Sequence, residues 1–74
     1  QEYSMALYYH ATGEQRKALV TAVSAYTGTP AVYQNAPTFA YAIGEYCVDK
    51  EGTLTGPASE ALITALQAKG FMAE

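Results

Sequence analysis

The side chains that could carry acid–base, nucleophilic or metal chemistry are few and widely separated in this sequence. His10 is the only histidine and Cys47 the only cysteine, and they lie in different halves of the chain. A nucleophile needs a base within hydrogen-bond reach, and a metal site needs several ligands at regular spacing. Neither pattern is present. We therefore assign no catalytic residue, no metal ligand and no cofactor-binding residue, and we expect a protein that is not an enzyme.

The acidic pair Asp49 and Glu51 flanks Lys50 just before Gly52. Calcium-binding loops use more oxygen ligands at alternating positions and end on a bidentate glutamate. This segment offers too few oxygen ligands to bind calcium. Aspartate is also common at the first position of a type I turn for structural reasons alone. We interpret it as a hairpin turn, His10 as a surface residue and Cys47 as an inert strand residue.

The charge balance disfavours nucleic acid as a partner. Seven acidic residues oppose four basic ones, which gives a net charge of −3. Arg16 and Lys17 are neighbours, whereas Lys50 and Lys69 belong to other segments, so we interpret all four as solvated charges rather than as a basic face. No apolar run approaches the roughly 20 residues of a membrane span. A single cysteine rules out an internal disulfide, so we expect a reducing compartment, the cytoplasm.

Seven tyrosines against two phenylalanines are the main compositional bias. We expect Tyr26, Tyr41 and Tyr46 in the core with their hydroxyls reaching its edge. Tyr8 and Tyr33 are the candidates for exposed aromatics, which suit protein recognition. Scattered surface aromatics without a role are an equal alternative.

The spacing of the apolar residues and the positions of the turn residues predict the elements that position these side chains. Residues 5–11 alternate like a strand, with Leu7 on the core face, and residues 31–34 form a second short strand. Residues 12–28 predict a helix with Thr12 as its N-cap and Gly28 at its end. Residues 57–69 predict another, with Pro57 in its first turn.

Residues 39–56 predict two consecutive hairpins. Gly44-Glu45 suits a two-residue type II′ turn, and residues 49–52 suit a type I turn with a glycine bulge. Both turns place the same large side chains on one face. These are Phe39, Tyr41, Ile43, Tyr46, Val48 and Leu54. The opposite face then holds small or polar residues, namely Ala40, Ala42, Cys47, Asp49, Thr53 and Thr55.

The elements together predict one domain spanning residues 1–74, of the α+β class. The order is β-α-β-β-β-β-α, a two-layer sandwich in which two helices cover one face of a mostly antiparallel sheet of four to five strands. Residues 1–4 either precede a natural start at Met5, as a linker or leftover segment, or extend the first strand.

Three segments resemble the N-terminal domain of small "virulence-related" proteins of Firmicutes. They are T-G-x-x-R-K-x-L-V at residues 12–20, A-P-T-F-A-Y-x-I-G at residues 36–44, and D-K-x-G-T-L-T-G at residues 49–56. The resemblance covers nearly the whole chain. It implies an origin near mobile elements, and it carries over no catalytic residue.

Two functions from different classes follow as hypotheses. The first is a non-catalytic protein-interaction or accessory module, whose small-residue face meets a protein partner, a second copy or a following domain of a longer protein. A solvated sheet face that happens to carry small residues is an equal alternative. The candidate surface residues of the module are Tyr8, Tyr33, Ala40, Ala42 and Cys47. The alternative is a nucleic-acid-associated accessory protein of a mobile element, which the acidic balance opposes.

Overall fold

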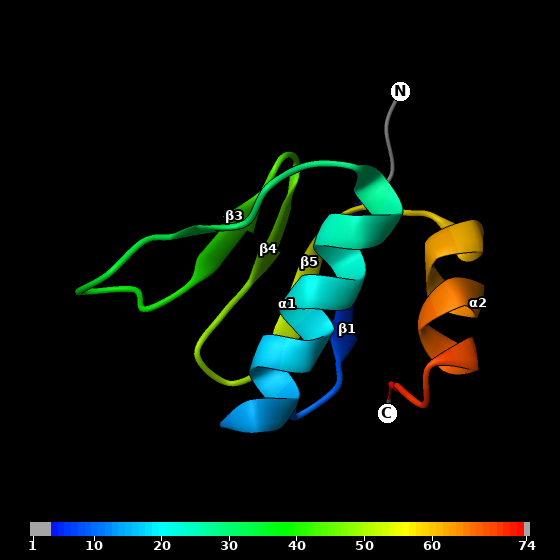
Figure 1. Ribbon diagram of the computed structural model, residues 1–74, viewed down its shortest axis with the longest axis horizontal. Coiled ribbons are helices and arrows are strands. Elements are labelled where there is room, and N and C mark those ends of the chain that lie inside the picture. The colour runs from blue at the N-terminus through cyan, green and yellow to red at the C-terminus, as the bar shows by residue number, and fades with distance from the viewer. Residues whose placement is uncertain (1–3, 74) are drawn as a thin grey trace.

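The protein folds as two layers, an antiparallel five-stranded sheet and a pair of helices (Figure 1). The computed structural model describes residues 4–73 of the chain. The sheet order is β1-β5-β4-β3-β2, and every neighbouring pair is antiparallel. The elements are β1 Ser4–Tyr8, α1 Glu14–Thr27, β2 Val32–Tyr33, β3 Tyr41–Ile43, β4 Tyr46–Val48, β5 Thr53–Pro57 and α2 Glu60–Ala68. The α+β class and the predicted element order are confirmed.

Both predicted hairpins form in the expected register. Tyr41 pairs with Val48 and Ile43 with Tyr46 across the first turn. Gly44 has a φ of 62°, and Glu45 is not among the residues of positive φ, as a type II′ turn requires. In the second turn the Asp49 carboxylate accepts hydrogen bonds from the backbone N–H groups of Glu51 and Thr53, each at 2.9 Å.

The core lies between the helices and one phase of the strands. Its fully buried members are Leu19 and Val23 of α1, Ile43, Val48 and Leu54 of the sheet, and Leu62 and Leu66 of α2. Burying each such side chain contributes about 1.5–3 kcal/mol. Because Leu7 pairs with Leu54, β1 adds its own apolar phase to the same layer.

Both helices begin later than the sequence predicts. The N-cap of α1 is Gly13 rather than Thr12, and no side chain caps it. Pro57 closes β5, and Ser59 caps α2 by accepting a hydrogen bond from the Leu62 N–H at 3.2 Å. A serine oxygen can satisfy a free amide of the first turn, which proline cannot do, and this favours the later start.

Phe39 is not on the core face, contrary to the prediction. Its φ is 54°, a left-handed value that breaks the strand alternation before β3 begins. The side chain is 41% exposed as a result, and the neighbouring Ala40 is only 5% exposed. Tyr26, also predicted in the core, is 49% exposed on α1.

The prediction for residues 1–4 falls mostly outside the described residues. Only Ser4 is described, and it pairs with Pro57 as the first residue of β1.

Candidate functional site

One row of small side chains crosses the sheet on the face away from the helices. The register joins Val32 to Ala42, Ala42 to Cys47, Cys47 to Thr55 and Thr55 to Ala6. We call this side of the sheet the open face. Within the strands its members are Ser4, Ala6, Tyr8, Val32, Ala42, Cys47, Thr53, Thr55 and Pro57. Among the described residues, the buried positions of both helices belong to the opposite side.

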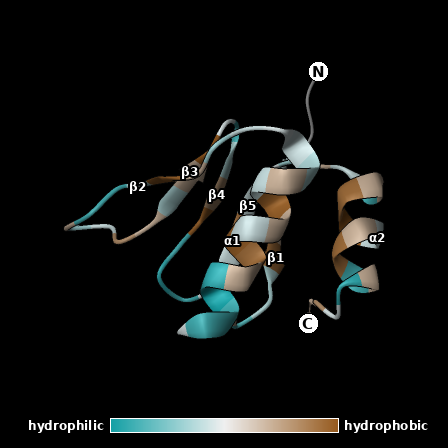
Figure 2. Cartoon of the chain, in the orientation of Figure 1, coloured by the Kyte–Doolittle hydropathy of each residue, from teal (hydrophilic) through white to brown (hydrophobic). Residues whose placement is uncertain are grey.

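Within the strands the open face carries no charged side chain, whereas Asp49, directly after β4, shares the phase of Cys47, and its charge acts on that thiol. As the structure describes them, the five strands contain no Asp, Glu, Lys or Arg at all. The strongly hydrophilic residues lie mainly in connecting segments and at the start of α1 (Figure 2). A solvated sheet face usually alternates apolar residues with clearly polar ones, and edge strands often carry lysine. The described strands carry no lysine at either edge of the sheet, and the centre of the open face carries only small side chains.

The structure brings three of the five predicted surface residues together on the open face. Tyr8 is 51% exposed there, and Ala42 and Cys47 are half-buried neighbours across β3 and β4. Tyr33 pairs with Tyr41 and so points to the helix side at the sheet edge. Ala40 shares the strand phase of Ala42 but is only 5% exposed, and it follows the left-handed Phe39 directly. Val32, Ala6 and Thr55 belong to the open face but were not among the predicted surface residues.

Cys47 occupies the central strand of the sheet and is a poor nucleophile. Burial raises the pKa of its thiol, and the negative charge of Asp49 raises it further. The thiolate is the reactive form of cysteine, so a raised pKa lowers reactivity near neutral pH. This geometry suits the inert strand residue that the sequence predicts.

Arg16 is a structural clamp rather than a solvated charge, which corrects the sequence interpretation. Its guanidinium donates hydrogen bonds to the Phe39 carbonyl at 2.7 Å and to the Asp49 carbonyl at 3.2 Å. The same group lies 5.0 Å from the centre of the Tyr41 ring, a cation–π contact. Tyr41 in turn contacts Tyr33, with ring centres 5.0 Å apart. No sequence signal separates Arg16 from Lys17, because the carbonyls that Arg16 binds come from distant loops.

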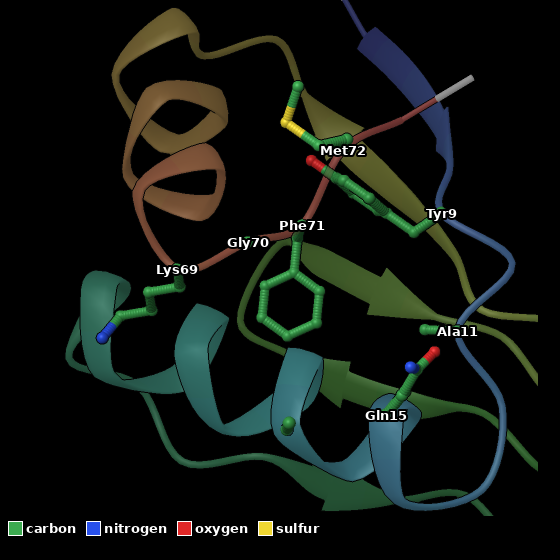
Figure 3. A pocket seen from close by; sticks show the side chains of 8 residues that line it. Tyr9, Ala11, Gln15, Lys69, Gly70, Phe71 and Met72 are labelled. Carbon is green, nitrogen blue, oxygen red and sulfur yellow. The ribbon is translucent and has the colours of Figure 1, made fainter.

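The described surface also has a hollow of about 370 Å³ between the start of α1 and the end of α2. Lys69 and Gln15 lie on opposite sides of the Phe71 ring, so their polar groups do not converge on one point (Figure 3). The Tyr9 side chain runs alongside Met72, and its ring meets Phe71 edge-on at 6.3 Å. The Tyr9 hydroxyl is buried without a hydrogen-bond partner, and burial raises its pKa. The sequence analysis did not anticipate this hollow.

His10, the other residue considered for acid–base or metal chemistry, is exposed just after β1 and has a φ of 54°. Within residues 4–73, no group of three or more His, Cys, Asp or Glu side chains is close enough to hold a metal ion.

Comparison with known proteins adds no assignment. No family model, no curated protein and no solved structure matches the chain. Within the part of the chain that the structure describes, no helix has the length and apolar character needed to cross a membrane.

Proposed function

We propose that this chain is a non-catalytic protein-interaction module that binds its partner through the open face. The observation that carries the proposal is a sheet face that neither helix covers and whose central row consists of small, uncharged side chains, with Asp49 at its rim. Small side chains let another backbone or sheet approach closely, and the exposed Tyr8 supplies an aromatic of the kind enriched at interfaces. The partner is therefore a protein surface that is flat and free of charge at its centre.

The strands of the open face carry no basic side chain, which disfavours a phosphate backbone as the partner. A phosphate backbone needs Lys or Arg to replace its counterions, and the open face offers none. The nucleic-acid alternative thus has no support on this face. Membership of the virulence-related family rests on the three sequence segments alone and adds no activity. The single cysteine supports a reducing compartment.

Photo-crosslinking in cells tests the proposal at one position of the open face. A benzophenone amino acid replaces Thr55, which is exposed at the centre of β5, and in a matched variant replaces Thr64, which is exposed on α2. We expect a discrete protein adduct from position 55 that is absent from position 64. The adduct should also disappear when Ala42→Lys places a charge on the same row.

Two results would contradict the interaction proposal. One is the absence of any protein adduct from position 55 at native expression levels. The other is an adduct pattern that is the same at positions 55 and 64, because that would show collision rather than binding through the open face.

A further inference from the structure

The backbone groups of β5 point to its two neighbours in a phase that one hydrogen bond fixes. The Asp49 N–H donates to the Thr53 carbonyl at 3.1 Å, so Thr53 directs its carbonyl toward β4. Successive residues of a strand direct their N–H and C=O groups to opposite sides. Leu54 and Gly56 therefore direct theirs toward β1. Pro57 then falls on the β4 side, which suits a residue without an N–H to donate to β1.

β1 consequently has a row of backbone groups that the sheet does not use. Met5 and Leu7 are the register partners of those two β5 residues, so their N–H and C=O groups point into the sheet. The groups of Ser4, Ala6 and Tyr8 point outward from the last strand of the order, and all three residues are exposed. Within the described part of the chain, no other backbone hydrogen bond reaches them, and β5 is the only element that runs closely alongside β1.

We infer that this free edge of β1 binds an extended peptide segment of another protein, which adds one more strand to the sheet. Main-chain hydrogen bonds supply the affinity in such strand addition. Donors and acceptors repeated at the spacing of a strand match another extended backbone, and this selects the class of partner. The inference goes beyond the proposed function, because it uses backbone groups at the edge rather than side chains of the open face.

β1 lacks the features that usually protect an edge strand from pairing. Native edges are blunted by lysine, proline, a bulge or a very short strand. β1 is five residues long, Ser4–Tyr8, contains neither lysine nor proline, and keeps a continuous register with β5. The opposite edge is different, since β2 has only two residues. The β1 edge is therefore the side of the sheet at which a strand can add.

The side chains of β1 indicate the composition of the added strand. Met5 and Leu7 pack against the core but remain partly exposed. Alternate side chains of an added strand lie beside them, so apolar residues at these positions remove further area from water. The other phase lies beside Ser4, Ala6 and Tyr8, where small or hydroxyl-bearing side chains fit. The expected segment thus alternates apolar residues with small polar ones.

Net charge favours a neutral or basic segment over a second copy of this chain. Two copies would each carry a net charge of −3 and repel one another, whereas a basic peptide is attracted. The strand itself carries no charge that would oppose this attraction. Its outward row is short, and ordering a free peptide offsets much of the gain, so we expect a dissociation constant of about 1 mM for a short peptide.

NMR hydrogen exchange of the purified chain tests the inference, with a synthetic heptapeptide as the probe. The probe alternates threonine and valine between two terminal lysines. In the free chain we expect fast exchange of the Ala6 and Tyr8 amides and slow exchange of the Met5 and Leu7 amides. Peptide at about 5 mM should slow the Ala6 and Tyr8 amides about sixfold, as the expected dissociation constant requires.

Matched peptides and variants show whether the backbone of the edge is responsible. In the added strand the threonine amides point toward β1 and the valine amides point away. N-methylation of the threonines should therefore abolish binding, and N-methylation of the valines should preserve it. Ala6→Pro removes an outward N–H and should weaken binding about tenfold, whereas Ala6→Thr keeps that N–H and should change it less than about twofold. Thermal unfolding verifies that both variants fold.

Four results would overturn the inference. The first is exchange of Ala6 and Tyr8 that about 5 mM peptide does not slow. The second is equal binding of the two methylated peptides. The third is loss of binding in Ala42→Lys, which lies on the open face three strands away and should have no effect on the edge. The last is protection of the Ala6 and Tyr8 amides that grows with the concentration of the chain alone, because a second copy would then occupy the edge.

Discussion

At the scale of single residues, Gly52 shows how closely this small fold is packed. It is buried with a φ of 83°, and an added Cβ would overlap the backbone of Ala11. The turn after β4 thus lies directly on the segment between β1 and α1. The sequence predicts a left-handed glycine here from the turn alone, but the contact with Ala11 is a tertiary feature that no local pattern encodes.

We expect Gly52→Ala to lower the free energy of unfolding by at least about 3 kcal/mol, because a side chain must both adopt a strained φ and displace backbone. Gly28→Ala is the matched control. Gly28 has a φ of 70° and nothing within 4 Å of an added Cβ, so only the conformational cost of about 1–2 kcal/mol applies. Urea denaturation measures both, and equal losses would contradict the close contact at Ala11.

Cys47 should react slowly with alkylating reagents, because burial and the Asp49 charge raise its pKa. Asp49→Asn removes the charge and retains the oxygen that accepts the two turn hydrogen bonds. We expect iodoacetamide to modify Cys47 more slowly than a free cysteine at pH 8, and faster in Asp49→Asn than in the wild type. Mass spectrometry follows the reaction, and an unchanged rate in the variant would rule out the influence of Asp49.

Tyr9 links a buried hydroxyl to the pH dependence of stability. Burial raises its pKa in the folded state above the usual value of about 10. As the pH rises past about 10 the unfolded chain ionises first, so the free energy of unfolding falls from there upward. Tyr9→Phe removes this loss, and at neutral pH it should add about 1 kcal/mol because the hydroxyl has no partner.

Chemical denaturation of both proteins between pH 7 and pH 11 gives the comparison for Tyr9. Cys47 is present in both, so the difference between the two curves isolates the Tyr9 hydroxyl. A wild type that loses no more stability than Tyr9→Phe across this range would contradict the effect.

At the scale of elements, Arg16 joins α1 to the two loops that flank β3 and β4. Its guanidinium binds the carbonyls of Phe39, 23 positions away in sequence, and Asp49, 33 positions away. Both backbone polar groups of the left-handed Phe39 are hydrogen-bonded. Its carbonyl accepts from Arg16, and its N–H donates to the Asn35 carbonyl at 2.8 Å. These contacts tie α1 to the residues that precede β3 and follow β4.

We expect Arg16→Gln to lower the free energy of unfolding by about 2 kcal/mol, since two charge-assisted hydrogen bonds and a cation–π contact are lost. Lys17→Gln is the matched control, because Lys17 forms only an exposed pair with Glu14 at 3.9 Å. Its effect should stay within about 0.5 kcal/mol. Comparable losses in the two variants would mean that Arg16 does not clamp the loops.

Some features of these elements could be predicted from the sequence, and others could not. The turns at Gly44 and Gly52 fix the register, so the placement of Tyr41, Ile43 and Val48 on one face follows from local chemistry. The end of α2 is equally local: the Gly70 N–H donates to the Gln67 carbonyl and the Phe71 N–H to the Leu66 carbonyl, which is the hydrogen-bond pattern of a Schellman end. Phe39 and Ala40 were misplaced because a tertiary contact, rather than strand alternation, decides their conformation.

At the scale of the whole molecule, the protein is a sheet with one face committed to a core and, within residues 4–73, the other covered by neither helix. The small residues of the open face were predicted from the hairpin register, and three of the five candidate surface residues lie there. The complete row across all five strands was not predictable, because the pairing of β1 with β5 joins opposite ends of the chain.

The most direct test of the open face is the solvent paramagnetic relaxation of methyl groups, measured by NMR in dilute solution. We expect strong relaxation at Ala6, Ala42 and Thr55, as at Thr64, and weak relaxation at Val48 and Leu54. Open-face methyls that relax as weakly as those of Val48 and Leu54 would contradict a face that is free to bind a partner.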